Sequence, residues 1–453
     1  MSLNHDIIVA PATASGGAIS IIRVSGDGSI ALCDRFFSAR KPLSQGATHT
    51  LHYGDFCDGQ RRVDDVLVSL FRAPHSYTGE ESVEISCHGS AYITREILSL
   101  LIQGGARLAE PGEFTIRAYL AGRMDLSQAE AVGDVIASQS RAQATLAATQ
   151  MRGGYSTTLE ELRAQLISLV ALLELELDFG EEDVEFASRT TLESTLTSLI
   201  KQISTLMSSF RVGNAIKEGV NVAIIGRPNA GKSTLLNQLL KEERAMVSDI
   251  AGTTRDLIEE QIDIEGVRYR FIDTAGLHTT EDRLEQMGIE RTQQAISRAE
   301  IVIHLVDAAE DTPLENIELS EEQRLIVVIN KMDKVAKVSE ELLSKIAPGK
   351  PIYISAKSGE GVAELIEQLA QSIDTEKLYA GEPIVSSTRH YNLLAESLES
   401  LQRALRALQD GISTELLCED IRLSLKPIGG ITGGEIDTES ILGHIFSSFC
   451  IGK

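Results

Sequence analysis

The chain has 453 residues, 43% of them apolar, and this length and composition suit a globular protein of about two to four domains. Its 42 basic and 66 acidic side chains give a formal net charge of −24, so it can hold nucleic acid only through a local basic patch or a basic partner. Five cysteines without a C-x-x-C pair argue against a disulfide framework and a cysteine-rich zinc site, and the lack of a signal-peptide pattern and of an apolar run of about 20 residues predicts a cytoplasmic protein that enters no membrane.

Residues 1–120 alternate short apolar runs with turns, which predicts an α+β domain. The expected strands lie at residues 7–9, 18–23, 49–54, 66–71 and 82–86, and the expected helices lie near 29–37 and 92–103. Arg23, Glu84 and Arg117 are charged residues in or beside these runs. The pattern alone favours an exposed strand face for all three.

Residues 121–215 are predicted as the first part of an α-helical domain. Two sequences fit capping boxes and so predict helix starts, S-Q-A-E at 127–130 and T-T-L-E at 190–193. From Leu192 to Met207 apolar residues recur every three or four positions, which is more typical of a bundle core than of a cofactor site. The acidic stretch at 180–185 matches no specific metal-ligand spacing and is expected to be a solvated turn.

A phosphate-binding loop is predicted at residues 226–233, with the sequence G-R-P-N-A-G-K-S. It follows an apolar run at 220–225 that predicts a strand, and it precedes a helical pattern. In such loops the glycines let backbone N–H groups turn towards phosphate oxygens. Lys232 is expected to reach the β and γ phosphates, and Ser233 to ligate magnesium. The alternative, a flexible turn before a buried helix, is disfavoured by the strand-loop-helix order and by the motifs that follow.

Four further motifs follow in order. The threonines of G-T-T-R-D at 252–256 offer a hydroxyl for the γ phosphate and for magnesium, and D-T-A-G at 273–276 offers a carboxylate near magnesium and a glycine N–H for the γ phosphate. In N-K-M-D at 330–333, Asp333 can accept two N–H bonds from a guanine edge, and S-A-K at 355–357 can present a backbone N–H to the guanine oxygen.

Together these motifs predict a guanine-nucleotide hydrolase domain over residues 216–378, with an α/β P-loop fold and a doubly wound, mostly parallel sheet. The candidate nucleotide-binding residues are Asn229, Ala230, Gly231, Lys232, Ser233, Thr234, Ser248, Asp249, Ile250, Ala251, Gly252, Thr253, Thr254, Asp273, Thr274, Ala275, Gly276, Asn330, Lys331, Asp333, Ser355, Ala356 and Lys357, with Ser233 and Thr254 as magnesium ligands.

The catalyst for hydrolysis is not evident from these motifs. Where Ras-like proteins carry a water-orienting glutamine directly after D-T-A-G, this chain has Leu277. An apolar side chain cannot position the attacking water. No arginine finger is identifiable from the sequence either, so the catalytic group must come from elsewhere.

Residues 379–453 restore a helical stripe after the nucleotide domain. We expect the helices before and after that domain to form one bundle with the nucleotide domain inserted into it, an arrangement that can transmit nucleotide-dependent movement. The chain closes with S-S-F-C-I-G-K at 447–453, in which Cys450 lies close to the end. Pattern alone favours a frayed tail for this segment.

The chain resembles the MnmE (TrmE) family of tRNA-modifying GTPases over essentially its full length. The markers are the phosphate loop, D-I-A-G-T-T-R-D at 249, D-T-A-G-L at 273, N-K-x-D at 330 and the terminal F-C-I-G-K, together with P-G-E-F at 111 and D-L-S-Q-A-E-A at 125. The resemblance implies a homodimer that works on certain tRNAs with the FAD-containing partner MnmG (GidA), in a heterotetramer. The product would be a carboxymethylaminomethyl or aminomethyl group at carbon 5 of the wobble uridine.

The one-carbon unit would come from a tetrahydrofolate derivative, 5-formyl- or methylene-tetrahydrofolate, bound by the dimerising amino-terminal domain. Matching positions make Arg23, Glu84, Arg123 and Lys453 folate-site candidates. The resemblance also implies that a potassium ion replaces the arginine finger and that Glu285 orients the attacking water. The potassium candidates are Asn229, Ser248, Ile250 and Thr253.

Several alternatives stay open at this point. Glu285 is one of several acidic residues in E-D-R-L-E at 281–285, and such residues often lie on a solvated helix face. Cys450 is either a reactive thiol near the folate or a residue packed in the bundle. For the whole chain the rival interpretations are a regulatory or ribosome-assembly switch similar to Era-type GTPases, without modification chemistry, and a GTPase whose helical body is only a dimer scaffold.

Overall fold

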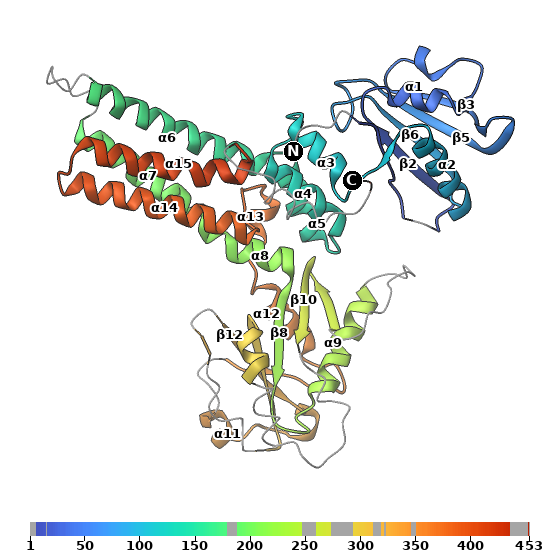
Figure 1. The fold of residues 1–453 in the computed structure, drawn as a ribbon. Coiled ribbons are helices and arrows are strands. Elements are labelled where there is room, and N and C mark those ends of the chain that lie inside the picture. The colour runs from blue at the N-terminus through green and yellow to red at the C-terminus, as the bar shows by residue number, and fades with distance from the viewer. Residues whose placement is uncertain are drawn as a thin grey trace. The chain divides into compact units, whose positions relative to one another are not determined.

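The structure is a computed structural model that describes residues 6–14, 16–178, 188–246, 260–272, 293–310, 319–320, 323–345, 350–434 and 452 (Figure 1). The chain divides into two compact units. One comprises residues 1–136, 150–197 and 396–453, and the other comprises 137–149 and 198–395. The domain limits that the sequence predicts, at 120, 215 and 378, stay predictions.

The amino-terminal part of the first unit is a seven-stranded sheet in the order β3-β4-β5-β6-β2-β1-β7. All neighbouring strands pair antiparallel except β1 and β7, which are parallel. The strands are β1 (Ile8–Pro11), β2 (Ile19–Ser25), β3 (Phe37–Ser38), β4 (Thr50–Asp58), β5 (Arg61–Phe71), β6 (Ser82–His88) and β7 (Arg107–Leu108). The helices are α1 (Ser29–Asp34), α2 (Ala91–Gln103) and α3 (Glu113–Leu120), with a 3-10 turn at Leu43–Gln45.

The two faces of this sheet have different neighbours because successive strand residues point to opposite sides. Val9 belongs to a core that also contains residues of α1 and α2. Its neighbours Ile8 and Ala10 pack instead with Phe114 of α3. The predicted α+β class and the positions of the main strands are therefore confirmed.

The helical elements are α4 (Leu126–Ala137), α5 (Arg141–Met151), α6 (Gly154–Asp178), α7 (Arg189–Ser208), α14 (Thr388–Gln409) and α15 (Thr414–Thr432). Helix α6 packs against α15, although about 250 residues separate them in the chain. Arg403 of α14 also pairs with Asp420 of α15 at 3.1 Å, and Gln409 of α14 donates to Glu193 of α7 at 2.8 Å. Helices from both sides of the nucleotide domain thus lie together (Figure 1), as predicted.

At both predicted capping boxes the capping residue lies two positions earlier than expected. At α4 the box is formed by Asp125 and Gln128: the Gln128 N–H donates to Asp125 Oδ1 at 3.0 Å, and the Asp125 N–H donates to Gln128 Oε1 at 2.9 Å. At α7 the Thr191 N–H donates to Ser188 Oγ at 3.2 Å, so Ser188 is the cap. The acidic stretch at 180–185 lies outside the described residues.

The second unit contains a six-stranded sheet in the order β13-β12-β11-β8-β10-β9. Every pair is parallel except β9 with β10, which confirms the predicted, mostly parallel sheet. The strands are β8 (Val220–Ile225), β9 (Glu260–Ile264), β10 (Val267–Ile272), β11 (Ile301–Asp307), β12 (Arg324–Asn330) and β13 (Ile352–Tyr353). The helices are α8 (Phe210–Glu218), α9 (Lys232–Met246), α11 (Glu340–Lys345), α12 (Val362–Ala370) and α13 (Glu376–Tyr379), with a 3-10 turn at Met332–Lys334.

The start of α5 is built into the core of the nucleotide unit. Ala142 and Leu146 are buried among residues of β8, β9 and β10. The Ala142 N–H donates to the carbonyl of Gly266, in the turn between β9 and β10, at 3.0 Å. Gly266 has φ +83°, and a Cβ there would lie 3.2 Å from Cβ of Arg141, so the turn fits a glycine.

None of the helices in the described ranges is long and apolar enough to cross a membrane.

Candidate functional site

The loop between β8 and α9 has the backbone that a phosphate-binding loop needs. Asn229 has φ +65°, a left-handed conformation that asparagine tolerates better than most residues. Gly231 has φ +103°, and a Cβ at that position would collide with Nδ2 of Asn330. The loop therefore requires its second glycine for two independent reasons. Ser233 and Thr234 follow in the first turn of α9, where free N–H groups attract anions.

Lys232 is held inside this loop. Its Nζ donates to the carbonyl of Gly226 at 2.8 Å and to that of Arg227 at 3.0 Å. Burial lowers the pKa of the Lys232 ammonium, because the charged form is less well solvated there. The loop thus fixes a positive charge beside the start of a helix, which is a suitable environment for a polyphosphate.

Asn330 joins the phosphate loop to the last motif. It ends β12 and is 2% exposed. Its Nδ2 donates to the carbonyl of Ala230 at 2.8 Å, and its Oδ1 accepts from the N–H of Ala356 at 2.9 Å. Parallel strands end at a common edge, so three motifs that lie far apart in the sequence meet at this residue.

Two carboxylates near Asn330, those of Asp333 and Asp307, bond to side chains of the guanine-recognition motifs. Ser355 Oγ donates to Asp333 at 2.7 Å, and this hydrogen bond lowers the pKa of the exposed Asp333 carboxyl. Asp307, at the end of β11, pairs with Nζ of Lys331 at 2.5 Å and is itself 6% exposed. Lys331 has φ +67°, an uncommon backbone conformation for a residue other than glycine.

The remaining nucleotide and catalytic candidates lie outside the described residues. They are Ser248, Asp249, Ile250, Ala251, Gly252, Thr253, Thr254, Asp273, Thr274, Ala275, Gly276 and Glu285. Cys450 and Lys453 also lie outside them, although Gly452 between these two is described.

A second candidate site surrounds Arg23 on β2. Its guanidinium pairs with Glu84 of the adjacent strand β6 at 2.9 Å, and the two side chains are 21% and 26% exposed. Nη1 of Arg23 also donates to the carbonyl of Gly452 at 3.5 Å. The structure therefore brings two folate candidates together beside a residue of the terminal C-I-G-K segment.

Two aromatic rings enclose the same guanidinium. Its central carbon lies 5.3 Å from the ring centre of Tyr77 and 5.7 Å from that of Phe114, distances at which a cation is attracted to a ring. Arg123, the third folate candidate in the described part, is exposed and follows α3, where its side chain lies beside Gly79. No contact of Arg123 with Arg23 or Glu84 is present among the described residues.

The expected exposed strand face is wrong for these charges. Arg23 and Glu84 are partly buried and paired. Arg117 is not on a strand at all: it lies on α3 and is 4% exposed. Glu113, one turn earlier on α3, and two carboxylates from distant segments, Asp6 and Glu80, compensate its charge. Local sequence could not show the contribution of the two distant carboxylates.

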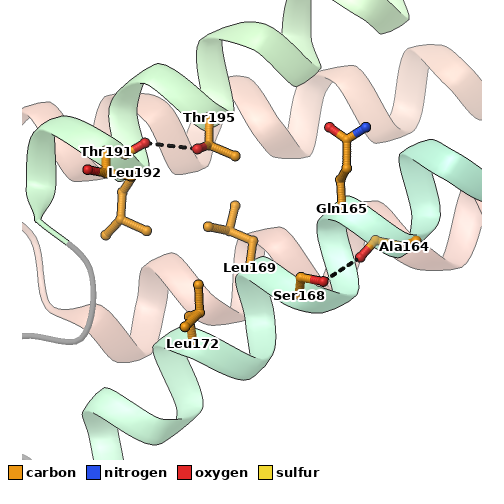
Figure 2. Close-up of a pocket in the computed structure, with 8 residues that line it drawn as sticks. All are labelled: Ala164, Gln165, Ser168, Leu169, Leu172, Thr191, Leu192 and Thr195. Atoms are coloured by element: carbon orange, nitrogen blue, oxygen red, sulfur yellow. Dashed lines mark hydrogen bonds between the residues drawn. The ribbon is translucent and has the colours of Figure 1, made fainter.

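A cavity of about 350 Å³ lies between α6 and α7 (Figure 2). Ser168 donates to the carbonyl of Ala164 at 3.0 Å and Thr195 to that of Thr191 at 2.9 Å, so these hydroxyls bond within their own helices. Leucine side chains form much of the remaining wall. The cavity offers little polar chemistry to a substrate, and we place the functional sites elsewhere.

Comparison with known proteins covers both units. The family model described as the MnmE helical domain matches residues 126–450, and the model described as the GTP-binding protein TrmE N-terminus matches residues 7–123. The chain is 48% identical over 467 residues to the tRNA modification GTPase MnmE of Bacteroides thetaiotaomicron, covering 100% of both chains. The chain belongs to the MnmE family of tRNA modification GTPases.

Other MnmE proteins give the same result. Identity is 48% to that of Porphyromonas gingivalis, covering 100% of this chain and 99% of the relative, and 47% to that of Christiangramia forsetii, covering 100% of both. Among solved structures, the G domain of FeoB from Methanococcus jannaschii is similar over 34% of this chain and 97% of its own, with 24% identity and a TM-score of 0.25.

In this MnmE-family chain, sequence reasoning missed residues that support the candidate sites. Tyr77 and Asp307 belong to no motif that was singled out, and Phe114 was noted only within P-G-E-F. A carboxylate at the end of an apolar strand, as at Asp307, is the one signal that could have been used. Tyr77 carries no comparable signal, because its role depends on a contact with Arg23 on another strand.

Proposed function

We propose that this chain is a potassium-activated GTPase that, with a flavoprotein partner, modifies the wobble uridine of certain tRNAs. The reaction would place a carboxymethylaminomethyl or aminomethyl group at carbon 5, using a one-carbon unit from tetrahydrofolate. The observation that carries the proposal is the junction at Asn330, which ties the phosphate loop to the two guanine-recognition motifs in a chain that belongs to the MnmE family.

The described residues suit a guanine nucleotide. Lys232 and the first turn of α9 would hold the phosphates, while Asp333 would accept two N–H bonds from the guanine edge. The Ala356 N–H is already given to Asn330, so the N–H for the guanine oxygen would be that of Lys357. Asp333→Asn is expected to weaken GTP binding and to shift preference towards xanthine nucleotides.

The donor set also suits the two metal ions. Ser233 supplies a hydroxyl in the first turn of α9, and Asn229 supplies an exposed amide oxygen, both hard ligands. Thr254 would complete the magnesium site, and Ser248, Ile250 and Thr253 the potassium site. Potassium, when bound beside the β and γ phosphates, would neutralise the charge of a loose transition state.

Glu285 is proposed to orient the attacking water, because Leu277 cannot. Glu285→Ala should then slow hydrolysis with little loss of nucleotide affinity. A collapse of nucleotide binding in this variant would instead give Glu285 a structural role.

The Arg23 site is proposed to bind the tetrahydrofolate derivative. Glu84 and Arg23 offer an acceptor and donors side by side, and both are partly open to solvent, so a heterocycle with amino and carbonyl groups can bond to both. Arg123 and Lys453 would add positive charge for the carboxylates of the ligand. Cys450, two residues before Gly452 in the sequence, is proposed as a reactive thiol of this site.

The amino-terminal domain, residues 1–120, is proposed to dimerise through the open face of its sheet. Tyr53 on β4 is 70% exposed and lies opposite Leu67 on β5, which is 40% exposed. Leu51 and Ile19 on the same sheet are 65% and 63% exposed. Large apolar side chains gathered on one sheet face favour protein contact over water. The MnmG (GidA) partner with its FAD would join this dimer in a heterotetramer that binds tRNA.

The decisive test measures GTP turnover in potassium and in sodium at equal ionic strength, for the wild type and for Asn229→Ala. We expect strong potassium stimulation that the variant loses. Equal rates in both salts would refute the potassium site and favour the alternative, a regulatory or ribosome-assembly switch without modification chemistry. Binding of 5-formyltetrahydrofolate by the full chain separates these alternatives independently, because a pure switch needs no folate.

A further inference from the structure

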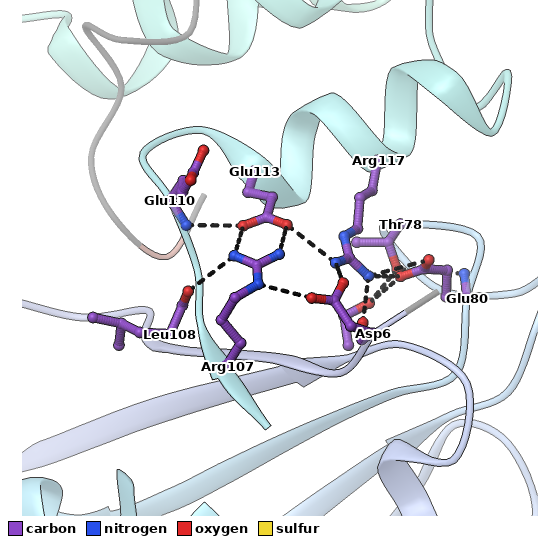
Figure 3. A network of polar contacts seen from close by, with 9 residues as sticks. Asp6, Thr78, Glu80, Arg107, Leu108, Glu110, Glu113 and Arg117 are labelled. Atoms are coloured by element: carbon purple, nitrogen blue, oxygen red, sulfur yellow. Dashed lines mark hydrogen bonds and ion pairs between the residues drawn. The ribbon is translucent and has the colours of Figure 1, made fainter. Parts of the chain in front are cut away.

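A network of five charged side chains lies on the side of the amino-terminal domain where α3 meets β1 (Figure 3). The network consists of the carboxylates Asp6, Glu80 and Glu113 and the guanidiniums Arg107 and Arg117. It joins three stretches that are distant in the sequence, at Asp6, at Glu80 and at residues 107–117. Because no nucleotide motif or folate candidate belongs to it, the functions proposed above leave it unexplained.

Arg117 is the centre of this network. It pairs with Asp6 at 2.7 Å, with Glu113 at 3.0 Å and with Glu80 at 3.2 Å, and it also donates to the carbonyl of Asp6 at 2.9 Å. Its side chain is 5% exposed, whereas that of Arg107 is 42% exposed. A charge this buried is costly unless every donor is satisfied, and the forked guanidinium satisfies several carboxylates at once.

The network is connected to the Arg23 site through Glu80. Glu80 also accepts from Ser25 Oγ at 3.0 Å, and Ser25 bonds to Thr78 at 2.7 Å, with both hydroxyl residues fully buried. Tyr77 lies next to Thr78 and contacts Arg23. Arg117 therefore fastens the loop segment that carries one of the two rings around Arg23.

The second ring is fastened by the helix that carries Arg117. Phe114 lies one turn before Arg117 on α3. Between them Thr115, fully buried, is bonded to the hydroxyl of Tyr77 at 2.9 Å. The Tyr77–Thr115 hydrogen bond thus connects the segment of Tyr77 to the helix of Phe114. Arg117 contacts both parts, the first through Glu80 and the second as a residue of α3.

We propose that Arg117 is a positioning residue for the one-carbon donor: through Glu80 and α3 it holds Tyr77 and Phe114 against Arg23, so that Arg23 meets the ligand already oriented. The inference rests on the proposed folate site. An arginine side chain loses conformational entropy when a ligand fixes its rotamer. If Tyr77 and Phe114 already fix the rotamer of Arg23 in the free protein, the ligand does not have to supply this entropy cost. For one side chain of this kind the cost corresponds to roughly three- to tenfold in affinity.

The test uses the full chain and calorimetric binding of 5-formyltetrahydrofolate. Tyr77→Phe and Thr115→Val each remove one side of the same hydrogen bond with almost no change of volume, and Arg117→Lys keeps the charge but loses the fork. We expect a loss of roughly three- to tenfold in affinity for each variant. The double variant Tyr77→Phe/Thr115→Val should lose no more than either single one, because both remove one interaction.

Arg107→Lys is the matched control. It alters the same network at Asp6 and Glu113 without touching Glu80, so its folate affinity should stay within about twofold of the wild type. Thermal unfolding and GTP turnover in potassium are measured on every variant. They separate a positioning role, in which folate affinity falls at unchanged GTP turnover and out of proportion to thermal stability, from a structural role, in which all three quantities fall together.

Three outcomes would overturn the inference. Wild-type affinity in Tyr77→Phe, Thr115→Val and Arg117→Lys would remove the positioning role and leave the folate site intact. A loss in Arg107→Lys as large as in Arg117→Lys, in proportion to the loss of thermal stability, would make the network structural only. An absence of folate binding by the wild type would reject the folate proposal itself, and this inference with it. If Arg117→Lys does not fold, the two isosteric variants decide.

Discussion

Asn330→Ala is the sharpest perturbation of the nucleotide site. It removes the donor to Ala230 and the acceptor for the Ala356 N–H, at 2.8 and 2.9 Å, and leaves both backbone groups without that partner in a buried position. Leaving a buried group unpaired costs about 1–3 kcal/mol, so the pair costs about 2–6 kcal/mol. In the free variant the two loops can relax so that these backbone groups reach water, and nucleotide binding must then restore the paired arrangement, so this cost should appear as lost affinity.

The assay is equilibrium binding of a fluorescent guanine nucleotide, together with thermal unfolding of the nucleotide unit. A cost of 2 kcal/mol at the lower limit corresponds to about thirtyfold weaker binding. Lys337→Ala is a suitable control, because its ion pair with Glu340 is almost fully exposed and should contribute little. Unchanged nucleotide affinity in Asn330→Ala would refute the view that this residue holds the two halves of the site together.

Three further predictions concern the same unit. Asp307→Asn removes the charge that holds Lys331, so guanine-nucleotide affinity should fall roughly three- to tenfold, and equal affinity would contradict that role. Gly231→Ala should abolish nucleotide binding in the same titration while the rest of the unit stays folded, because its Cβ collides with Asn330; normal binding would show that the loop can relax. His304 on β11 is 2% exposed, and burial lowers its pKa to about 4. Below about pH 6.5 His304 therefore binds a proton in the unfolded chain but stays neutral in the folded chain. As the pH is lowered from 6.5 to 4, the free energy of unfolding should fall by on the order of 3 kcal/mol. Denaturant unfolding should show a smaller pH dependence in His304→Leu, and an identical one would remove His304 as the cause.

Local patterns predicted the elements well because their signals are short in range. Alternating apolar residues marked β2, β5 and β6, and the phosphate loop was recognised from its glycines and Lys232. The error at α4 is also local: the sequence D-L-S-Q-A-E contains two overlapping capping patterns, starting at Asp125 and at Ser127, and only the three-dimensional structure selects the first.

What the sequence could not provide are contacts between distant segments. Arg117 was expected to be exposed because it is a charged residue beside an apolar run. Besides Glu113, one helical turn away, Asp6 and Glu80 compensate its charge, and these two come close to Arg117 only in the folded chain. The role of Asn330 as a link to Ala230 likewise depends on how β8 and β12 end at one edge of the sheet. The motif identified Asn330 as a site residue, but only the fold shows that its side-chain amide bonds to Ala230 and Ala356.

The hydrogen bond between the Ala142 N–H and the Gly266 carbonyl couples helix α5 to the turn between β9 and β10. The strands β9 and β10 continue directly into residues 247–259 and 273–292, the stretches that carry the γ-phosphate motifs in the sequence, and their connecting turn is bonded to α5 at 3.0 Å. A hydrogen bond is lost beyond about 3.5 Å, so the hairpin has only about half an ångström of free travel. Any larger displacement must break the bond or drag α5 with it, and α5 leads along the chain to α6 after two residues. A spectroscopic label on α5, outside the nucleotide site, would therefore register a shift of the hairpin as long as this bond holds.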